Sequence, residues 1–154
     1  MNPFEATIGA SVSCAKTVSE SDVYLFAGIT GDLSPNHVDE VAMSGTRYGG
    51  RIAHGALLVG YMSRASTMIG DTCEALMRGH YPVSLGYDRI RLLAPVHIGD
   101  TIEIVYTIVS VDPERLRTIG DIVVTNQHGK TVAVAQHILK FVPNVVQSES
   151  GGSV

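Results

Sequence analysis

The feature that most constrains this chain is a long apolar run from Gly55 to Ile69, in which Arg64 is the only charged residue. As an α-helix, the run would span about 22 Å at roughly 1.5 Å per residue. A helix that is apolar on nearly all sides is expected to be buried on nearly all sides, because it presents no polar face to water. Gly70 is a suitable residue to end it. The rest of the chain is therefore expected to enclose one central helix.

The second half of the chain is typical of β-strands joined by short turns. We predict strands at residues 8–18, 84–96, 101–111, 116–125 and 131–142. Within 101–111, apolar residues occupy alternate positions, as in a strand with one buried face. These residues are Ile102, Ile104, Tyr106 and Ile108. Short connections of this kind favour an antiparallel meander.

Between the first strand and the long helix we predict short helices and a loop. Ser19 and Asp22 have the spacing of a capping box, which satisfies free backbone N–H groups at a helix start. The order is then strand, short helices, long helix and four strands, with an irregular connection at residues 71–82. We predict an α+β protein in which one curved antiparallel sheet wraps around the long helix. The outer face of that sheet would meet water or a second subunit.

The bulk properties of the chain exclude several classes of partner. Its 154 residues fit one domain, which we assign to residues 1–142, and residues 143–154 are expected to be a disordered tail. A net charge of −4, without a run of Lys or Arg, speaks against a nucleic-acid partner. No apolar run reaches the ~18 residues of a membrane span, so no membrane partner is expected. The N-terminus lacks the regions of a secretory signal, and Cys14 and Cys73 are isolated, so we expect a cytoplasmic protein.

A candidate acid–base pair lies in the loop before the long helix. Asp32 and His37 stand close together in sequence, and Pro35 between them stiffens the loop. Two titratable groups held on one rigid loop can share a water, so that one takes its proton while the other gives a proton to the substrate. The N–H of Gly55, at the helix start, can stabilise a developing negative charge. The sequence therefore predicts acid–base chemistry beside a helix N-terminus.

Structural roles are also consistent with these residues. Asp32 could bond its own backbone in an Asx-turn, and His37 could be a packing residue under the loop. Asp39 is expected either to cap the next helical turn or to act as a supporting partner of His37. His54 is interpreted as a structural residue at the helix start. The histidines lack HExxH or paired-Cys spacing, so no metal is expected.

Residues 31–37, Gly-Asp-Leu-Ser-Pro-Asn-His, resemble the Gly-Asp-x-Asn-Pro-x-His motif of the MaoC-like, (R)-specific enoyl-CoA hydratases. The context is similar as well. A Phe-Ala-Gly helix end precedes the motif, Arg-Tyr-Gly-Gly-Arg-Ile-Ala-His-Gly follows at residues 47–55, and Leu-Ala-Pro-Val stands at residues 93–96. The similarity extends over residues 18–141. One residue departs from the motif, since Ser34 stands in place of its Asn.

The resemblance implies a hot-dog fold, in which a sheet wraps around a long helix, and a homodimer or larger assembly whose sheets join edge to edge. It also implies reversible syn addition of water to a trans-2-enoyl-CoA, or to an acyl carrier protein thioester, which gives the (R)-3-hydroxyacyl thioester. Asp32 and His37 would hold the water, and the N–H of Gly55 would bind the thioester carbonyl. Ser34 would support the pair with its single hydroxyl. Such a reaction needs no metal or redox cofactor.

Two other functions fit the same features. A thioesterase on this fold would use a carboxylate to direct water at the thioester carbonyl, although the spacing of His37 speaks against it. A non-catalytic protein that binds acyl thioesters would keep the cavity, and Ser34 mildly favours that alternative. Release of free CoA thiol, or binding without turnover, would distinguish these alternatives from hydration.

Overall fold

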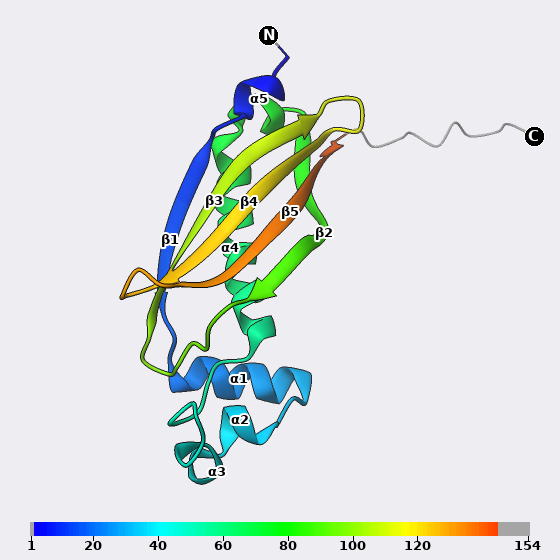
Figure 1. Ribbon diagram of the computed structural model, residues 1–154. Helices are drawn as coiled ribbons and strands as arrows, with labels where there is room; N and C mark the ends of the chain where they lie inside the picture. Colours follow the sequence, from blue (N-terminus) through cyan, green and yellow to red (C-terminus); the bar gives the residue numbers. More distant parts are fainter. Residues whose placement is uncertain (1, 145–154) are drawn as a thin grey trace, which may run out of the picture.

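The structure, a computed structural model, describes residues 2–144 and places a five-stranded sheet against one long helix (Figure 1). The chain begins with the 3₁₀ turn η1 (Glu5–Thr7) and strand β1 (Ser11–Thr17). The helices follow: α1 (Glu20–Thr30), α2 (Pro35–Val38), α3 (Glu40–Ser44), α4 (Gly55–Thr72) and α5 (Glu74–Met77). The last strands are β2 (His80–Leu92), β3 (Thr101–Asp112), β4 (Arg117–Asn126) and β5 (Thr131–Pro143). The predicted α+β class is confirmed.

The sheet is antiparallel throughout, with the strand order β1-β3-β4-β5-β2. The predicted meander is right for β3, β4 and β5 but wrong for β2, which pairs with β5 at the far edge and not with β3. The connection between β2 and β3, residues 93–100, is longer than a hairpin turn and lets β3 pair with β1 and β4 instead. This order brings both edge strands to α4, which contacts β1, β2, β3 and β5.

The boundaries of α4 and β2 differ from the prediction because these two elements pack closely. α4 continues past Gly70, where an added Cβ atom would lie 3.2 Å from Cγ of Pro82, so this glycine allows close packing and does not end the helix. β2 begins at His80, earlier than predicted, and includes Pro82. An edge strand tolerates proline because one side of its backbone is unpaired. Part of the connection predicted to be irregular forms α5.

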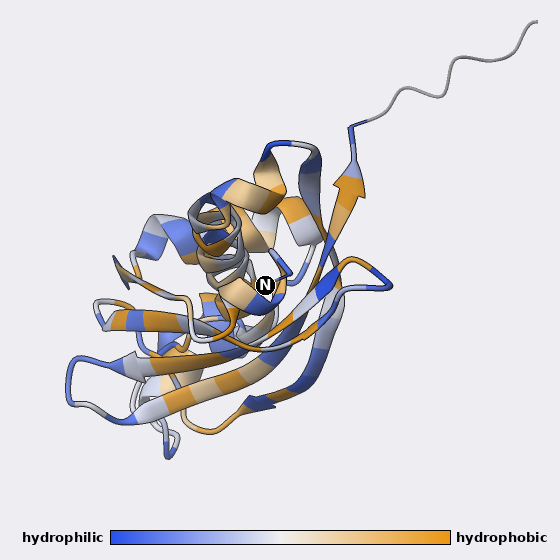
Figure 2. Cartoon of the chain, turned by 90° about the horizontal axis from the view of Figure 1, so that it is seen from above, coloured by the Kyte–Doolittle hydropathy of each residue, from blue (hydrophilic) through white to orange (hydrophobic). Residues whose placement is uncertain are grey.

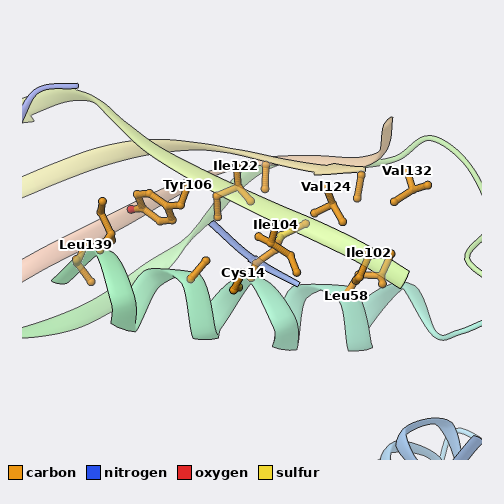
Figure 3. Packing of buried hydrophobic residues seen from close by; sticks show 14 of the residues in the cluster. Cys14, Leu58, Ile102, Ile104, Tyr106, Ile122, Val124, Val132 and Leu139 are labelled. Atoms are coloured by element: carbon orange, nitrogen blue, oxygen red, sulfur yellow. The ribbon is translucent and has the colours of Figure 1, made fainter. Parts of the chain in front are cut away.

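The core lies between α4 and the inner face of the sheet (Figure 3). From α4 it contains Leu58, Met62 and Ile69, which are at most 3% exposed. Apolar residues alternate with polar ones along the strands, as the colours of Figure 2 show. The strands contribute the buried side chains of Ile102, Ile104, Tyr106, Ile108, Ile122 and Val124, which confirms the alternation predicted for 101–111. Each buried side chain of this size contributes about 1.5–3 kcal/mol relative to an exposed one.

One face of α4 is exposed in the single chain, so the prediction of burial on nearly all sides is wrong. The exposed residues follow a helical stripe and are small or polar, namely Ala56, Gly60, Ser63, Arg64 and Thr67. The sheet covers only the opposite side of the helix, where the large apolar residues gather. Small side chains make a helix look apolar in sequence without requiring that it be enclosed.

The core contains a buried histidine that has polar partners. His137 of β5 is fully buried, its Nδ1 is 3.0 Å from Oη of Tyr106, and its Nε2 is 2.8 Å from Oγ of Ser84. Burial lowers the pKa of His137 to about 4, because removing an imidazolium from water is costly. Gly120 makes room for the tyrosine, since an added Cβ atom would lie 2.0 Å from Cε1 of Tyr106.

The helices α1, α2 and α3 form a separate layer at the N-terminal end of α4, beyond the end of the sheet, whereas α5 lies at the other end of α4 (Figure 1). α1 starts with the predicted capping box, in which Ser19 and Asp22 each accept the N–H of the other. Within the described residues, no helix has both the length and the apolar composition to cross a membrane. β5 extends to Pro143, and residues 145–154 of the predicted tail lie outside the described residues.

Candidate active site

α1 delivers Asp32 to the surface near the start of α4. The helix ends at Gly31, whose left-handed conformation (φ 77°) is one that glycine adopts without strain. Asp32 follows with an exposed side chain, and its Oδ1 accepts the N–H of Ser34 at 3.3 Å. This contact is the Asx-turn considered as a structural role. It uses one carboxylate oxygen and leaves the other for a further hydrogen bond.

α2 carries His37 inward. This single turn opens with Pro35 at its first position, where the missing N–H is not needed. The His37 side chain is buried, and its Nδ1–H donates to the backbone oxygen of Ile52 at 2.7 Å. Because a carbonyl oxygen can only accept, the proton of neutral His37 lies on Nδ1 and the lone pair on Nε2. Nε2 is therefore the basic nitrogen of this residue.

Two further side chains connect to His37 in series. Nδ2 of Asn36 donates to Nε2 of His37 at 3.2 Å, and Oγ of Ser34 donates to Oδ1 of Asn36. Ser34 thus reaches His37 through Asn36, a residue that the sequence prediction did not single out. Asp39 takes the first of its two expected roles, since its carboxylate accepts the N–H of Ala42 at 2.9 Å and caps α3.

A network around Arg51 fixes the carbonyl group that His37 contacts. The Arg51 guanidinium donates to Oε1 of Glu20 at 2.7 Å, to Oε2 of Glu40 at 2.9 Å and to Oη of Tyr24 at 3.1 Å. The hydrogen bonds to Glu20 and then Glu40 raise the pKa of Arg51 above its usual value. α1 and α3 are thereby tied to the segment that holds Ile52, so the position of the imidazole depends on all three.

His54 also belongs to the site, although its interpretation from sequence was that of a structural residue at the helix start. It is 1% exposed, and its Nε2–H donates to the backbone oxygen of Asp32 at 3.0 Å. Its ring stacks on that of His37, with centroids 3.7 Å apart and an interplanar angle of 26°. Phe26 lies 4.8 Å away from the His54 ring. His54 therefore contacts both members of the predicted pair, and the His-Gly pair that opens the long helix was the available signal.

The side chains of Asp32, His37 and His54 converge, with one potential ligand atom of each within 4.8 Å of the others. A carboxylate and two imidazoles are a donor set that some metals use. A metal binds an imidazole in the plane of the ring, however, and two nearly parallel stacked rings do not direct their lone pairs to a common point. Hydrogen bonds already engage three of the four ring nitrogens. The arrangement suits proton transfer around a water.

A cavity of about 600 Å³ opens beside His37. Gly55 lines it, and an added Cβ atom there would lie 2.1 Å from Cδ1 of Leu92, so a larger residue at position 55 would require the Leu92 side chain to move. As the first residue of α4, Gly55 has an N–H without a partner inside the helix, at the positive end of the helix dipole. Other walls are mostly apolar and include Ile52, Ala53, Leu58, Leu93, Ala94, Pro95 and Val96. The cavity thus has a basic nitrogen and a backbone donor in its walls.

Comparison with known proteins places these features in a family. Residues 3–132 match the family described as MaoC like domain. An (R)-specific enoyl-CoA hydratase from Rhodospirillum rubrum is 39% identical over 107 residues, which cover 70% of this chain and 69% of that protein. A 3-hydroxybutyryl-CoA dehydratase from Methylorubrum extorquens is 34% identical over 110 residues, which cover 71% of this chain and 65% of that protein.

The fold of this chain is also similar to that of a solved hydratase structure. The solved structure of R-hydratase PhaJ1 from Pseudomonas aeruginosa in its unliganded form superposes with a TM-score of 0.75 and 25% identity, covering 96% of this chain and 91% of that one. The hot-dog fold implied by the sequence resemblance is confirmed, with α4 as the long helix against which the sheet packs. On the family match over most of its length, the chain belongs to the MaoC-like dehydratase family.

Proposed function

We propose that this protein is a hydro-lyase that adds water reversibly to a trans-2-enoyl thioester and forms the (R)-3-hydroxyacyl thioester. The single observation that carries the proposal is the convergence of Asp32 and His37 beside a cavity in which Gly55 begins α4. The names of the relatives support the reaction class, since one is a hydratase and another a dehydratase of CoA thioesters. The two names describe opposite directions of one equilibrium.

Asp32 and His37 act together on one water in this proposal. The lone pair on Nε2 of His37 takes one proton of the water, while a carboxylate oxygen of Asp32 accepts a hydrogen bond from the other proton. The hydroxide adds to the β-carbon of the enoyl group, and the proton held by the pair passes to the α-carbon on the same face. Both side chains return to their starting state, so no cofactor is consumed. Acid–base catalysis of this kind contributes about 10²–10⁴-fold.

Gly55 acts on the other end of the conjugated system. Its N–H donates to the thioester carbonyl oxygen, which gains negative charge as the hydroxide adds to the β-carbon. The positive end of the α4 dipole stabilises the same charge. The mostly apolar walls of the cavity, including Leu58, Leu92 and Leu93, accommodate the acyl group. The thiol part of the substrate is CoA or the phosphopantetheine arm of an acyl carrier protein.

The proposed enzyme is a homodimer or a larger assembly of the same chain. β2 is an edge strand, and its side chains Tyr81, Val83 and Leu85 are 38–49% exposed although apolar. An edge with these properties is suited to pair with a second copy, because both its backbone groups and its apolar side chains lack cover. The free and buried cysteines Cys14 and Cys73 support the cytoplasm as its location.

The test follows the enoyl-thioester absorbance after purified protein is mixed with crotonyl-CoA. We expect the absorbance to fall without release of thiol. Asp32→Asn and His37→Gln are each expected to lower kcat/KM by about 10²–10⁴-fold. His128→Gln, in the turn between β4 and β5 and exposed to solvent, is the matched control and should behave like the unchanged protein.

Other results would reject the proposal. Full activity in a folded Asp32→Asn protein would remove Asp32 from the mechanism. Release of thiol with the double bond intact would identify a thioesterase. Binding of crotonyl-CoA and of longer enoyl thioesters without any turnover would identify a non-catalytic protein that binds acyl thioesters.

A further inference from the structure

A chain of hydrogen bonds passes through His37 and includes two side chains that the proposed mechanism does not use. Oγ of Ser34 donates to Oδ1 of Asn36, and Nδ2 of Asn36 donates to Nε2 of His37 at 3.2 Å. On the other side of the ring, Nδ1–H donates to the backbone oxygen of Ile52 at 2.7 Å. Asn36 also lines the cavity, so its amide lies where a water and an acyl group would arrive.

The direction of this chain depends on whether His37 carries one proton or two. The Ile52 carbonyl only accepts, so it holds a proton on Nδ1 in either case. In the neutral ring Nε2 is an acceptor, and the Asn36 amide presents its NH₂ group to it. After His37 takes a proton, Nε2–H becomes a donor that needs an acceptor, and an NH₂ group opposite it would be repulsive.

Rotation of the Asn36 amide by about 180° removes this repulsion, because its oxygen and its NH₂ group exchange places. The two groups have opposite hydrogen-bonding character and nearly the same size. With the amide turned, Oδ1 of Asn36 accepts from Nε2–H, and Nδ2 faces Ser34. The Ser34 hydroxyl can donate or accept, so it holds the amide in both orientations. A residue at position 34 without a hydroxyl would hold neither.

We propose that Asn36, held by Ser34, is a positioning residue that follows the protonation state of His37. In the resting enzyme its NH₂ group covers the lone pair on Nε2. The incoming water replaces that contact, and after proton transfer the turned amide accepts from Nε2–H and stabilises the imidazolium. The proposal rests on the proposed function, to which it adds two residues. It also gives a role to Ser34, the residue that departs from the motif, because its hydroxyl holds the Asn36 amide.

Other side chains around His37 do not provide this hydrogen bond to Nε2. Asp32 accepts the N–H of Ser34 with one carboxylate oxygen, and in the proposed mechanism its carboxylate accepts from the shared water. His54 stacks on the ring face of His37 and donates to the backbone of Asp32, so its hydrogen-bonding atoms do not meet Nε2. Within the described residues, Asn36 is the side chain bonded to the basic nitrogen.

The variants separate this role from simple packing. Asn36→Leu keeps the size of the side chain and removes both polar ends, and Asn36→Asp keeps the shape but can only accept from Nε2. Ser34→Ala removes the hydroxyl, whereas Ser34→Thr keeps it. Ser44→Ala is the matched control, because Ser44 is another exposed serine whose hydroxyl donates to a nearby carbonyl, that of Val41 at 3.1 Å, away from His37.

The experiment combines kinetics with ¹⁵N NMR of the histidine rings. We expect Asn36→Leu to lower kcat roughly 10- to 100-fold, the size of one lost hydrogen bond to a charged group, with KM changed much less. Ser34→Ala should lower kcat in the same direction, Ser34→Thr should restore it, and Ser44→Ala should leave it unchanged. A kcat in Asn36→Leu equal to that of the unchanged protein would overturn the proposal.

The spectra test the contact between Asn36 and His37 without any substrate. Their result therefore does not depend on whether the proposed hydration activity is found. The signals of His37 are assigned by their loss in His37→Gln. At pH 8 we expect the unchanged protein to carry a proton on Nδ1 and a bare Nε2, and Asn36→Asp to carry protons on both nitrogens. A proton on Nε2 in the unchanged protein, or identical His37 signals in Asn36→Asp, would overturn the proposal.

Discussion

Three histidines are buried in the described part of the chain, and their partners assign them different chemistry. His37 contacts a carbonyl and an amide, and His54 contacts a carbonyl and a second imidazole ring. The buried His137 bonds the hydroxyls of Tyr106 and Ser84, and its ring centroid lies 4.5 Å from that of Tyr87. Hydroxyl groups satisfy a neutral ring but bring no negative charge, so His137 resists protonation while the folded state persists.

The stability of the fold should therefore fall as the pH decreases from about 6.5 to about 4. His137 has a pKa of about 4 in the folded protein, whereas in an unfolded chain it has the ordinary histidine pKa of about 6.5. Between these values only the unfolded state is protonated, which favours unfolding by about 3 kcal/mol in total. The free energy of unfolding, measured by urea denaturation at several pH values, should rise with pH across this range and level off above it.

A variant without the imidazole isolates this effect. In His137→Gln the free energy of unfolding should change less steeply with pH between pH 4 and 6.5. The decrease in slope should correspond to at most one fewer proton taken up on unfolding. An unchanged slope would show that other groups carry the effect. Asp22 titrates at a lower pH. Burial raises its pKa, but hydrogen bonds with Lys16 and Ser19 lower it by more, to a net value of about 2. The stability that ionised Asp22 adds to the folded state is therefore lost only as the pH falls below about 3.8.

At the scale of elements, the helices α1 and α3 depend on one side chain. Arg51 reaches Glu20, Tyr24 and Glu40, and its own side chain is 13% exposed. Arg51→Lys keeps the charge but replaces a planar fork by a single ammonium group, which cannot reach the three partners together. We expect hydration activity to fall more than thermal stability does, because the network holds the layer near His37 and not the core.

Hydrogen exchange provides the structural measurement for this variant. Amides of residues 35–44 should exchange faster in Arg51→Lys, whereas those of β3 and β4 should keep their protection. Glu103→Gln, an exposed charge on β3, is the control for loss of a surface charge as such. Unchanged activity and unchanged exchange in Arg51→Lys would show that α1 and α3 hold their places without this network.

Elements set by neighbouring residues could be predicted from sequence. The alternation in 101–111 and the capping box of Ser19 and Asp22 act between residues close in the chain, and both are confirmed. The place of β2 could not be predicted, because its pairing with β5 is decided by contacts between segments far apart in sequence. The same reason applies to α4, whose exposed face depends on which side the sheet covers.

The candidate site, too, was predictable from sequence only in part. The sequence predicted Asp32, His37 and Gly55, and the structure brings the first two together and places Gly55 at the cavity. It did not predict the contacts of Asn36 and His54, because one depends on the direction of a side chain and the other on ring stacking that forms only in the folded protein.

At the scale of the whole molecule, assembly through β2 can be tested with a matched pair of charges. Val83 of β2 and Val123 of β4 are 38% and 39% exposed, but only Val83 lies on an edge strand. Val83→Lys should reduce the mass measured by light scattering to that of a single chain, because a charge on an edge blocks strand pairing. Val123→Lys should keep the larger mass. An assembly that survives in Val83→Lys would place the contact elsewhere.

The last residue of β2 constrains how such a protein can adapt to new acyl groups. Leu92 lines the cavity, occupies the space that a side chain at Gly55 would need, and is 55% exposed at the end of an edge strand. A substitution at Leu92 would change the shape of the cavity, the packing against Gly55 at the start of α4 and the end of edge strand β2. Selection for a change in one of these properties would therefore be opposed by its effects on the others. Divergence in substrate range within such a lineage should therefore accumulate at enclosed cavity positions such as Leu58 and Val96.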